Sequence, residues 1–431
     1  MEEKNTLSEK ALEQHRLYKG KMEAFPKCPI RDFQDFGIWY TPGVAAVCKE
    51  IQKNDDSVFD YTNKWNNVAV VSDCTRVLGL GDIGPYAGLP VMEGKALLFK
   101  YLGGVDAFPV CLDTKNPEDI INIVKWIQPS FGGINLEDIE KPKCFQILET
   151  LRKESNIPVW HDDQQGTATV ILAGLMNALK VIGKKKDDIS VTMIGAGAAG
   201  IKTTEMIIKA GFNPKKIIMV DSKGILNQNR DDIKDTYKWN MCLKTNGENR
   251  EGNISNALKD SDVCIAFSKP GPGTIKKEWI SKMSDDSIVF ACANPVPEIW
   301  PDDAKEAGAR IVATGRSDFP NQVNNSLGFP GIFRGVLDVR AKTITDEMCL
   351  AASHEIAKFS EEKGINENYI IPRMDEWEIF PREAVAVGMQ AIKQNIAKKR
   401  LSESELYEIS SSIIKRSRDI METLMKKGLI K

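Results

Sequence analysis

The sequence predicts a two-domain α/β protein, with a Rossmann-type doubly wound parallel sheet in one domain and a second α/β domain for the substrate. Short apolar runs rich in Val and Ile alternate with amphipathic segments along most of the chain, a pattern typical of parallel strands joined by crossover helices. A glycine-rich loop stands between one such run and a helical segment. With 42% hydrophobic and 27% charged residues over 431 positions, the chain can bury a large core.

The first predicted domain opens with a charged helical segment over residues 8–22. Apolar runs that predict buried strands lie at residues 68–71, 108–112, 132–136 and 157–160. Helical patterns at residues 118–127 and 144–155 separate some of these runs. We therefore expect residues 1–161 to form an α/β substrate domain.

A second series of strand-like runs follows a small, apolar helical segment at residues 167–181. The runs recur about every 25 residues, as repeated βα units do. They lie at residues 189–194, 216–220, 263–267, 287–292 and 311–313. We expect residues 162–324 to form a nucleotide-binding domain, and residues 325–431 to form a helical segment that returns to the first domain.

The last predicted helix carries its apolar residues on one face and basic residues on the other, so we expect the apolar face to be packed and the basic face solvated. The apolar residues are Leu406, Ile409, Ile413, Ile420 and Leu424.

The charge balance excludes two kinds of partner. Lys and Arg total 58 against 60 Asp and Glu, a net charge of −2, which offers no basic surface for nucleic acid or an acidic membrane. The most apolar stretch, residues 168–179, is interrupted by Thr169, Gly174 and Asn177, so we expect no membrane span.

Cysteines and the N-terminus indicate the compartment. The nine cysteines include no CxxC pair and are typical of reduced thiols, not of disulfides or a zinc site. Glu2, Glu3 and Glu9 make the N-terminus unlike a signal peptide. We therefore expect a cytoplasmic protein.

The glycine-rich loop predicts a dinucleotide site in a Rossmann-type domain. An apolar run leads into Gly195-Ala-Gly-Ala-Ala-Gly200, where the glycines would permit a tight turn, close approach of a pyrophosphate and close packing of the next helix. Asp221 ends the next run, where a carboxylate binds a ribose 2′-hydroxyl and favours NAD over NADP, although Lys223 nearby would partly offset that preference. A glycine turn without a ligand is the alternative. The candidate cofactor residues are Gly195, Ala196, Gly197, Ala198, Ala199, Gly200, Asp221 and Ser222.

Acidic pairs end two neighbouring strands of the first domain. Glu137-Asp138 and Asp162-Asp163 would repel one another unless a cation lies among them, and oxygen ligands favour Mg²⁺ or Mn²⁺ over zinc. Neighbours in an extended strand point to opposite faces, so Glu137 and Asp138 can share a metal only if the chain turns there. Solvated acids that cap helices would explain the spacing equally well.

Three further side chains are candidates for acid–base chemistry or substrate binding. Arg76, at a strand end, could pair with a carboxylate. Lys95, among glycines and apolar residues, could have a lowered pKa suited to a general base. Each could instead be an ordinary surface cation, and Tyr40 could be an interfacial aromatic.

Together these segments resemble malic enzyme, the NAD(P)-dependent oxidative decarboxylase of L-malate. The similarity runs from about Tyr40 to Asp338 and is looser beyond Ile371. Its length and the Met-Glu-Gly-Lys95 sequence resemble the small, prokaryote-type branch, whereas Arg76 and Gln165 resemble the larger, eukaryote-type members. The segments that carry the resemblance are Tyr40–Ala45, Val77–Asp82, Pro90–Lys95, Phe131–Asp138, His161–Ala168, Asn294–Pro297 and Asn324–Gly335.

The resemblance implies a role for each site residue. Lys95 would be the general base, with Asp162 as its partner, and Tyr40 the general acid. The remaining implied roles are metal binding by Glu137, Asp138 and Asp163, malate binding by Arg76, Asn294 and Asn325, and a further contact of Asn294 with the cofactor. The resemblance also implies NAD or NADP, Mg²⁺ or Mn²⁺, the substrate–product pair malate and pyruvate, and a homodimer.

Two other functions remain open from the sequence. An amino-acid dehydrogenase also joins an α/β substrate domain to a Rossmann-type domain, but it would need no carboxylate metal site. A non-catalytic dinucleotide sensor would bind NAD without turning over malate.

Overall fold

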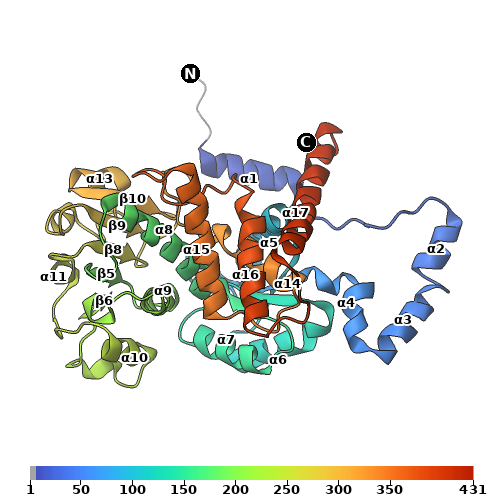
Figure 1. Cartoon of the computed structure of the whole chain (residues 1–431), viewed down its shortest axis with the longest axis horizontal. Helices are drawn as coiled ribbons and strands as arrows, with labels where there is room; N and C mark the ends of the chain where they lie inside the picture. Colours follow the sequence, from blue (N-terminus) through green and yellow to red (C-terminus); the bar gives the residue numbers. More distant parts are fainter. Residues whose placement is uncertain (1–5, 431) are drawn as a thin grey trace.

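Two separate sheets organise the chain in the computed structural model, which describes residues 6–430 (Figure 1). One sheet has the strand order β2-β1-β3-β4 and the other β10-β9-β8-β5-β6-β7. All strand pairs are parallel except the short antiparallel pair β6–β7. The prediction of an α/β protein with a Rossmann-type parallel sheet and a second α/β sheet is confirmed. Glu2 and Glu3 lie outside the described residues.

The first sheet contains all of the strands predicted before residue 162. They are β1 (Asn67–Ser72), β2 (Asp106–Cys111), β3 (Gly133–Leu136) and β4 (Val159–His161). Its helices are α5 (Gly84–Gly103), α6 (Pro117–Ile127) and α7 (Lys143–Glu154). The sequence pattern missed α5, because Gly88, Pro90 and Gly94 interrupt its helical signal.

The second sheet is the nucleotide-type unit. Its strands are β5 (Val191–Ile194), β6 (Ile217–Asp221), β7 (Gly224–Ile225), β8 (Val263–Ala266), β9 (Ser287–Ala291) and β10 (Ala309–Thr314). The helices in this part of the chain are α8 (Thr167–Ile182), α9 (Ala198–Lys209), α10 (Tyr237–Lys244), α11 (Ile254–Leu258), α12 (Lys277–Ile280) and α13 (Pro301–Glu306).

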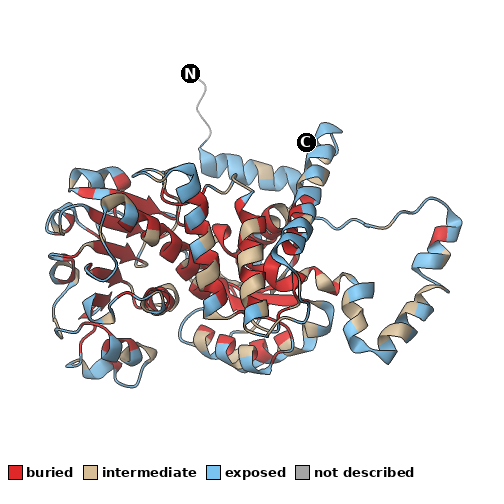
Figure 2. Ribbon diagram, in the orientation of Figure 1, coloured by how far each residue is buried: buried red, intermediate tan, exposed pale blue. Residues whose placement is uncertain are grey.

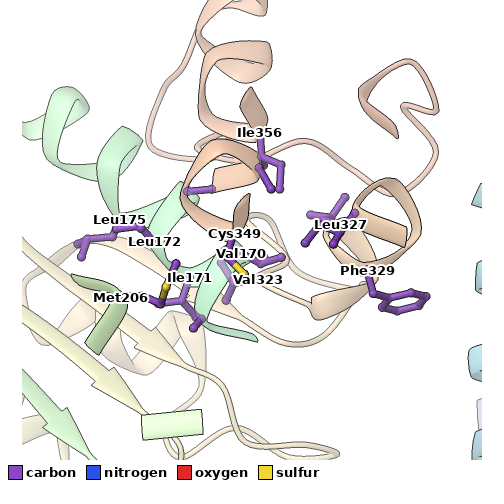
Figure 3. Packing of buried hydrophobic residues seen from close by; sticks show 14 of the residues in the cluster. Val170, Ile171, Leu172, Leu175, Met206, Val323, Leu327, Phe329, Cys349 and Ile356 are labelled. Carbon is purple, nitrogen blue, oxygen red and sulfur yellow. The ribbon is translucent and has the colours of Figure 1, made fainter. Parts of the chain in front are cut away.

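The apolar helix α8 is a core helix. By length and composition the segment Asp162–Ile182 could cross a membrane, but 72% of its most apolar window is buried inside the protein. Figure 3 shows its side chains packed among those of other elements. The labelled residues are Val170, Ile171, Leu172 and Leu175 from α8, with Met206, Val323, Leu327, Phe329, Cys349 and Ile356 around them. Membrane-like hydrophobicity here reflects burial within the protein.

The C-terminal helices connect the two sheets. They are α14 (Phe329–Asp338), α15 (Asp346–Lys363), α16 (Ile379–Lys393) and α17 (Glu403–Lys426). α14 packs against α5 and α16, while α15 packs against α8. This packing places the segment that follows the second sheet against the helices of the first (Figure 1).

The predicted apolar face of α17 is confirmed in part: Leu406 is buried and Ile413, Ile420 and Leu424 are half-buried. Its buried residues are Leu406, Ser410, Ser411, Ile414 and Ser417, whereas Ile409 is 38% exposed. The Ser417 hydroxyl donates to the carbonyl of Lys100 in α5 at 2.8 Å. The small serines allow α17 to approach α5 closely, and they widen the packed surface beyond the face that the hydrophobic pattern indicated.

The N-terminal helices are less embedded than the rest of the chain. They are α1 (Leu7–Tyr18), α2 (Phe33–Trp39), α3 (Val44–Lys53) and α4 (Val58–Tyr61). α1 ends before the predicted boundary because Lys19 adopts a left-handed conformation with φ 56°. In Figure 1, α2 and α3 project from the body, and Figure 2 shows that they are mostly exposed.

A buried ion pair in α14 should dominate local stability. Arg334 donates to Asp338 at 2.6 Å and to Asn66 Oδ1 at 2.6 Å, and both ionic side chains are almost fully buried. Arg334→Leu should lower the free energy of unfolding by about 3–5 kcal/mol, because it leaves a buried carboxylate unpaired. Urea denaturation measures this change. The control Arg310→Leu, which breaks exposed pairs with Glu367 and Asp286, should cost below about 1 kcal/mol. Equal effects of the two substitutions would contradict the prediction.

Candidate active site

Acidic side chains and one lysine meet at the carboxyl ends of β3 and β4. Glu137 and Asp138 follow β3, and Asp163 follows β4. One carboxylate oxygen from each of these three residues lies within 4.8 Å of the others. The structure therefore brings together the three residues that the sequence suggested as metal ligands.

A left-handed turn at Asp138 allows two adjacent acids to point into one site. Asp138 has φ 51°, so the chain leaves its extended path directly after Glu137. The turn is held by hydrogen bonds: the Asp138 N–H donates to Asp163 Oδ2 at 2.9 Å, and the Arg76 N–H donates to the Asp138 carbonyl at 3.0 Å. The requirement that the chain turn at this point is met.

The electrostatics of the cluster fit a divalent cation. Burial raises the pKa of Glu137 and of Asp138 well above their usual values, and Asp163 beside them adds to the effect. Within residues 6–430, Asp138 Oδ2 is a buried oxygen without a hydrogen-bond partner. Crowded carboxylates with a free oxygen suit Mg²⁺ or Mn²⁺, so these residues could hold such an ion.

Lys95 reaches the cluster from α5. Its Nζ lies 2.7 Å from Asp162 Oδ2, 3.1 Å from Glu137 Oε1 and 4.6 Å from the centre of the Phe329 ring. Burial alone lowers the pKa of Lys95, but Asp162 and Glu137 outweigh that effect and raise the pKa above its usual value. The expectation of a lowered pKa is wrong for this arrangement, because the acids brought to Lys95 by the fold favour its charged form.

Asp162 is held firmly at the start of a π-helical turn, Asp162–Gly166. The Trp160 indole N–H donates to Asp162 Oδ1 at 3.1 Å. A Cβ added at Gly166 would lie 1.9 Å from the same oxygen, so only glycine fits beside this carboxylate. Burial raises the pKa of Asp162, with the positive charge of Lys95 opposing that shift. Gln165 is buried and accepts from the backbone N–H of His161, a structural contact.

The candidate substrate-binding residues lie around this cluster. Asn325 Oδ1 accepts from Lys95 Nζ at 3.3 Å. Asn294 lies where the loop after β1 meets the nucleotide-type unit, since a Cβ at Gly79 would approach the Asn294 carbonyl to 2.5 Å. Arg76 is exposed, and its guanidinium donates to the carbonyl of Leu78. These residues come from both halves of the chain.

Tyr40 is not brought to the cluster within one chain. It follows α2, is 70% exposed, and lies on the segment that projects away from α5 in Figure 1. Tyr40 therefore cannot act as general acid beside Lys95 of its own chain in this structure.

The glycine loop has the geometry expected for each glycine. Gly195 has φ 110°, and a Cβ there would lie 2.4 Å from the Phe267 carbonyl. A Cβ at Gly200 would lie 1.9 Å from the Gly195 carbonyl, which explains the close packing of α9 on the strand. Around Gly197 a Cβ would meet only Lys141, at 3.9 Å, so the backbone there is open to a ligand. These residues could hold a pyrophosphate at the start of α9.

Cations that the sequence did not indicate lie at the end of β6. Arg230 and Lys238 bind the Asp221 carboxylate at 2.7 and 2.5 Å. Burial alone would raise the pKa of Asp221, but these hydrogen bonds lower it to about 2. Ser222 lies in the turn that follows Asp221. Lys141 faces the glycine loop from the first domain. No sequence motif marks Arg230, Lys238 or Lys141, because they follow unrelated elements and converge only in the fold.

Two family descriptions match the chain. Residues 19–122 match "Malic enzyme, N-terminal domain", and residues 164–395 match "Malic enzyme, NAD binding domain". The NAD-dependent malic enzyme of Geobacillus stearothermophilus is 51% identical over 381 residues, covering 88% of this chain and 78% of that protein. The bifunctional malic/malolactic enzyme of Bacillus subtilis is 48% identical over 403 residues, covering 94% and 97%. The NADP-dependent malic enzyme of Halomonas elongata is 39% identical, covering 90% and 94%.

Solved structures agree with these sequence relationships. The crystal structure of Entamoeba histolytica malic enzyme superposes with a TM-score of 0.96 at 51% identity, covering 98% of this chain and 89% of that one. Malic enzyme from Pyrococcus horikoshii gives a TM-score of 0.92 at 52% identity, covering 98% and 99%.

Substitution of two glycines in the loop should affect cofactor binding and protein stability separately. Gly197→Ala should leave the free energy of unfolding within about 0.5 kcal/mol, because the added methyl meets open space, yet weaken NAD(P) binding by filling the approach of the pyrophosphate. Gly200→Ala should instead destabilise the protein through its 1.9 Å clash. Fluorescence titration with NADH and urea denaturation measure the two effects. Unchanged NADH affinity in a folded Gly197→Ala variant would contradict this role of the loop.

Proposed function

The chain belongs to the malic enzyme family, NAD(P)-dependent enzymes that oxidatively decarboxylate malate, and we propose that it uses a divalent metal ion held by Glu137, Asp138 and Asp163. Family membership argues against an amino-acid dehydrogenase and against a non-catalytic sensor. The observation that carries the proposal is the position of Lys95, 2.7 Å from Asp162 and 3.1 Å from Glu137, beside the three clustered carboxylates.

The chemistry of malate explains why the general base must lie next to the proposed metal site. Direct loss of CO₂ would leave a carbanion without stabilisation, so oxidation at C2 comes first. Lys95, when neutral, takes the C2 hydroxyl proton. Asp162 keeps the Lys95 amine in place and receives its proton for passage to solvent. A nicotinamide held at the glycine loop would supply the hydride acceptor for C2, and a divalent cation held by Glu137, Asp138 and Asp163 would supply the positive charge that favours loss of CO₂.

The protonation state of Lys95 depends on the charge around it. The field of the carboxylates raises its pKa, as their positions beside Nζ require. Positive charge held among Glu137, Asp138 and Asp163 would cancel this field and lower the pKa of Lys95. The acid cluster would thereby couple metal binding to activation of the base.

We propose that Asn325 and Asn294 bind malate through their amides and that Arg76 pairs with a substrate carboxylate. Asn325 already touches Lys95, which favours a position beside the reacting hydroxyl. The Arg76 backbone bonds the Asp138 loop, so its side chain starts close to the metal ligands. A dicarboxylate is then bound by groups from both sides of the site.

We propose NAD as the preferred cofactor, with NADP used less efficiently. Asp221 at the end of β6 is ionised and offers acceptors for a ribose 2′-hydroxyl. Arg230 and Lys238 occupy much of that carboxylate, and with Lys223 they reduce the repulsion that a 2′-phosphate would meet.

We propose a homodimer in which Tyr40 acts as general acid in the site of the other subunit. The projecting segment exposes Phe33, Phe36, Ile38 and Trp39 as well as Tyr40, an apolar surface that favours burial against a partner. The open outer face of α17, which includes Tyr407 and Leu424, offers a second surface for association. Tyr40 of one subunit would protonate C3 of the product enol in the site that contains Lys95 of the partner subunit.

The reaction and its metal dependence are testable together. Purified protein with malate, Mn²⁺ and NAD⁺ should form NADH, with a lower rate on NADP⁺, and pyruvate should appear in equal amount. Excess EDTA should abolish turnover, and added Mn²⁺ should restore it, because the carboxylates alone cannot stabilise the developing charge. Full activity in EDTA would remove the metal from the proposal.

Loss of the proposed base should affect turnover specifically. Lys95→Ala should lower kcat by about 10²-fold or more, the usual contribution of a general base, with malate still bound. Lys202 is a matched control: it is equally buried (9% exposed) and paired with Asp346, but lies on α9. Steady-state kinetics should show near-normal kcat for Lys202→Ala. An unchanged kcat for Lys95→Ala would reject its assignment.

Mixing two inactive variants tests whether Tyr40 acts across the dimer. Tyr40→Phe and Lys95→Ala should each be nearly inactive alone. After subunit exchange, about half of the dimers carry both substitutions on opposite subunits with one intact site, so activity should recover to about a quarter of wild type. Action within one chain predicts no recovery, and that result would overturn the proposed role.

A further inference from the structure

Glu298 is a fully buried acidic residue at the carboxyl ends of two neighbouring strands. Its relative exposure is 0%, although Glu is seldom fully buried unless its charge is paired. β8 ends at Ala266 and β9 ends at Ala291, and the two strands pair in parallel, so the loops that follow them begin at the same edge of the sheet. Neither the glycine loop nor the acidic cluster around Lys95 includes Glu298, so its burial must be explained by other contacts.

The Glu298 carboxylate bonds both of these loops. The Ser268 N–H donates to Glu298 Oε1 at 2.8 Å, and the Ser268 hydroxyl donates to the same oxygen at 3.1 Å. The Ala293 N–H donates to the other oxygen, Oε2, at 3.0 Å. Burial raises the pKa of Glu298, and these donors oppose that rise because they stabilise the charged form. One side chain thus bridges the loop after β8 and the loop after β9.

Backbone hydrogen bonds join the same two loops farther from the strands. The Gly271 N–H donates to the Val296 carbonyl at 3.3 Å, and the Ile275 N–H donates to the carbonyl of Glu298 at 3.2 Å. Residues 267–275 and 292–298 therefore form one unit, here termed the paired loops. Within this unit the start of the second loop depends on Glu298, because the only backbone donor of Ala293 is the N–H that the carboxylate binds.

This bond precedes a residue proposed to bind malate. Ala293 is followed directly by Asn294, so the bond fixes the path of the backbone into Asn294. A Cβ added at Gly315 would lie 2.7 Å from Asn294 Nδ2, so the amide rests against the backbone that follows β10. The Asn324 amide donates to the Gly315 carbonyl at 3.3 Å. The same backbone thus contacts the Asn294 amide and the residue that precedes Asn325, the second amide proposed for malate.

The paired loops also contact the first domain. A Cβ added at Gly79 would lie 2.5 Å from the Asn294 carbonyl, 2.7 Å from Pro270 Cγ and 3.2 Å from Pro295 Cδ. Pro270 belongs to one of the paired loops, and Asn294 and Pro295 belong to the other. Gly79 lies in the segment that leads into α5, the helix that carries Lys95. The position of the paired loops therefore affects how the two domains meet beside the site.

We propose that Glu298 is a positioning residue for the reaction on malate, and that its bridge between the loops after β8 and β9 holds the Asn294 amide where the substrate binds. This role rests on the proposed function, which assigns malate to Asn294. Glu298 acts through the backbone N–H groups of Ser268 and Ala293 and makes no contact with the substrate itself.

Glu298→Gln removes the bridge with the smallest change in shape. A glutamine amide has one acceptor oxygen, so it cannot accept from both Ser268 and Ala293. Directing that oxygen toward Ser268 keeps two hydrogen bonds and turns the NH₂ group toward the Ala293 N–H, where two donors oppose each other. KM for malate should rise about 10-fold, the cost of one unsatisfied buried donor. Because Asn294 binds malate both before and during the reaction, kcat should change less than KM.

Asp262 offers a matched control at the opposite end of β8. Its Oδ2 accepts from the Ser190 N–H at 2.8 Å and from the Ser190 hydroxyl at 3.0 Å, as Glu298 accepts from Ser268. Asp262 directly precedes β8 and so lies at the amino edge of the sheet, away from Asn294. Asp262→Asn should lower the free energy of unfolding as Glu298→Gln does, yet leave KM for malate unchanged.

The test combines steady-state kinetics with hydrogen–deuterium exchange on the full-length enzyme. KM and kcat are measured with malate, Mn²⁺ and NAD⁺, and urea denaturation compares the stability of the two variants. In Glu298→Gln, peptides that contain residues 292–298 should exchange faster than in the wild type, because the Ala293 N–H has lost its acceptor. In Asp262→Asn, faster exchange should appear around Ser190 and not in the paired loops. If Glu298→Gln folds poorly, Glu298→Asp serves instead, since its shorter side chain cannot keep both bonds at their present lengths.

The outcomes distinguish this proposal from the proposed function. Unchanged exchange in residues 292–298 of Glu298→Gln would overturn the bridge, and this measurement needs no turnover. Faster exchange with an unchanged KM for malate would overturn the effect on substrate binding. An equal rise in KM for Asp262→Asn would also overturn it, because general destabilisation would then account for the change. A wild-type enzyme that is inactive on malate would reject the proposed function, while the exchange data would still decide whether Glu298 holds the loops.

Discussion

The buried contact between Lys95 and Asp162 is the interaction on which the site depends. It joins α5 to the turn that leaves β4, and Glu137 from β3 completes it at 3.1 Å. Burying several carboxylates is costly unless positive charge accompanies them. Lys95 supplies part of that charge, and Asp138 Oδ2, which has no hydrogen-bond partner among the residues that the structure describes, leaves a place for a cation. The pairing with Lys95 therefore stabilises the arrangement, and the negative charge that Lys95 does not balance prepares the site for a metal ion.

Backbone geometry makes this concentration of charge possible. The left-handed residue Asp138 turns two consecutive acids toward one point, and Gly166 leaves room for the Asp162 carboxylate. Another left-handed residue, Cys74, precedes the segment that bonds the Asp138 loop. Non-glycine residues with positive φ are uncommon, and two of them border the acidic cluster, where unusual backbone conformation aims side chains.

Much of the fold was predictable from local pattern. Every apolar run identified in the sequence forms a strand, because burial on both faces of a parallel sheet demands a continuous apolar sequence. Helix α5 was missed because its glycines and proline weaken the local signal, while packing against β2 and α14 stabilises it. The apolar pattern of α17 indicated only part of its packed face, because the serines that also pack are polar residues and add nothing to that pattern.

The sequence by itself determined the α/β class, the glycine loop, the candidate acids and the family resemblance, since these depend on residue type and short-range order. Only the tertiary structure decided which charges act on one another. The raised pKa of Lys95, the two cations on Asp221 and the position of Tyr40 away from its own chain's cluster all depend on how separate elements are arranged. Electrostatic and hydrogen-bond energies depend on separation in space, and a sequence specifies that separation only through the complete fold.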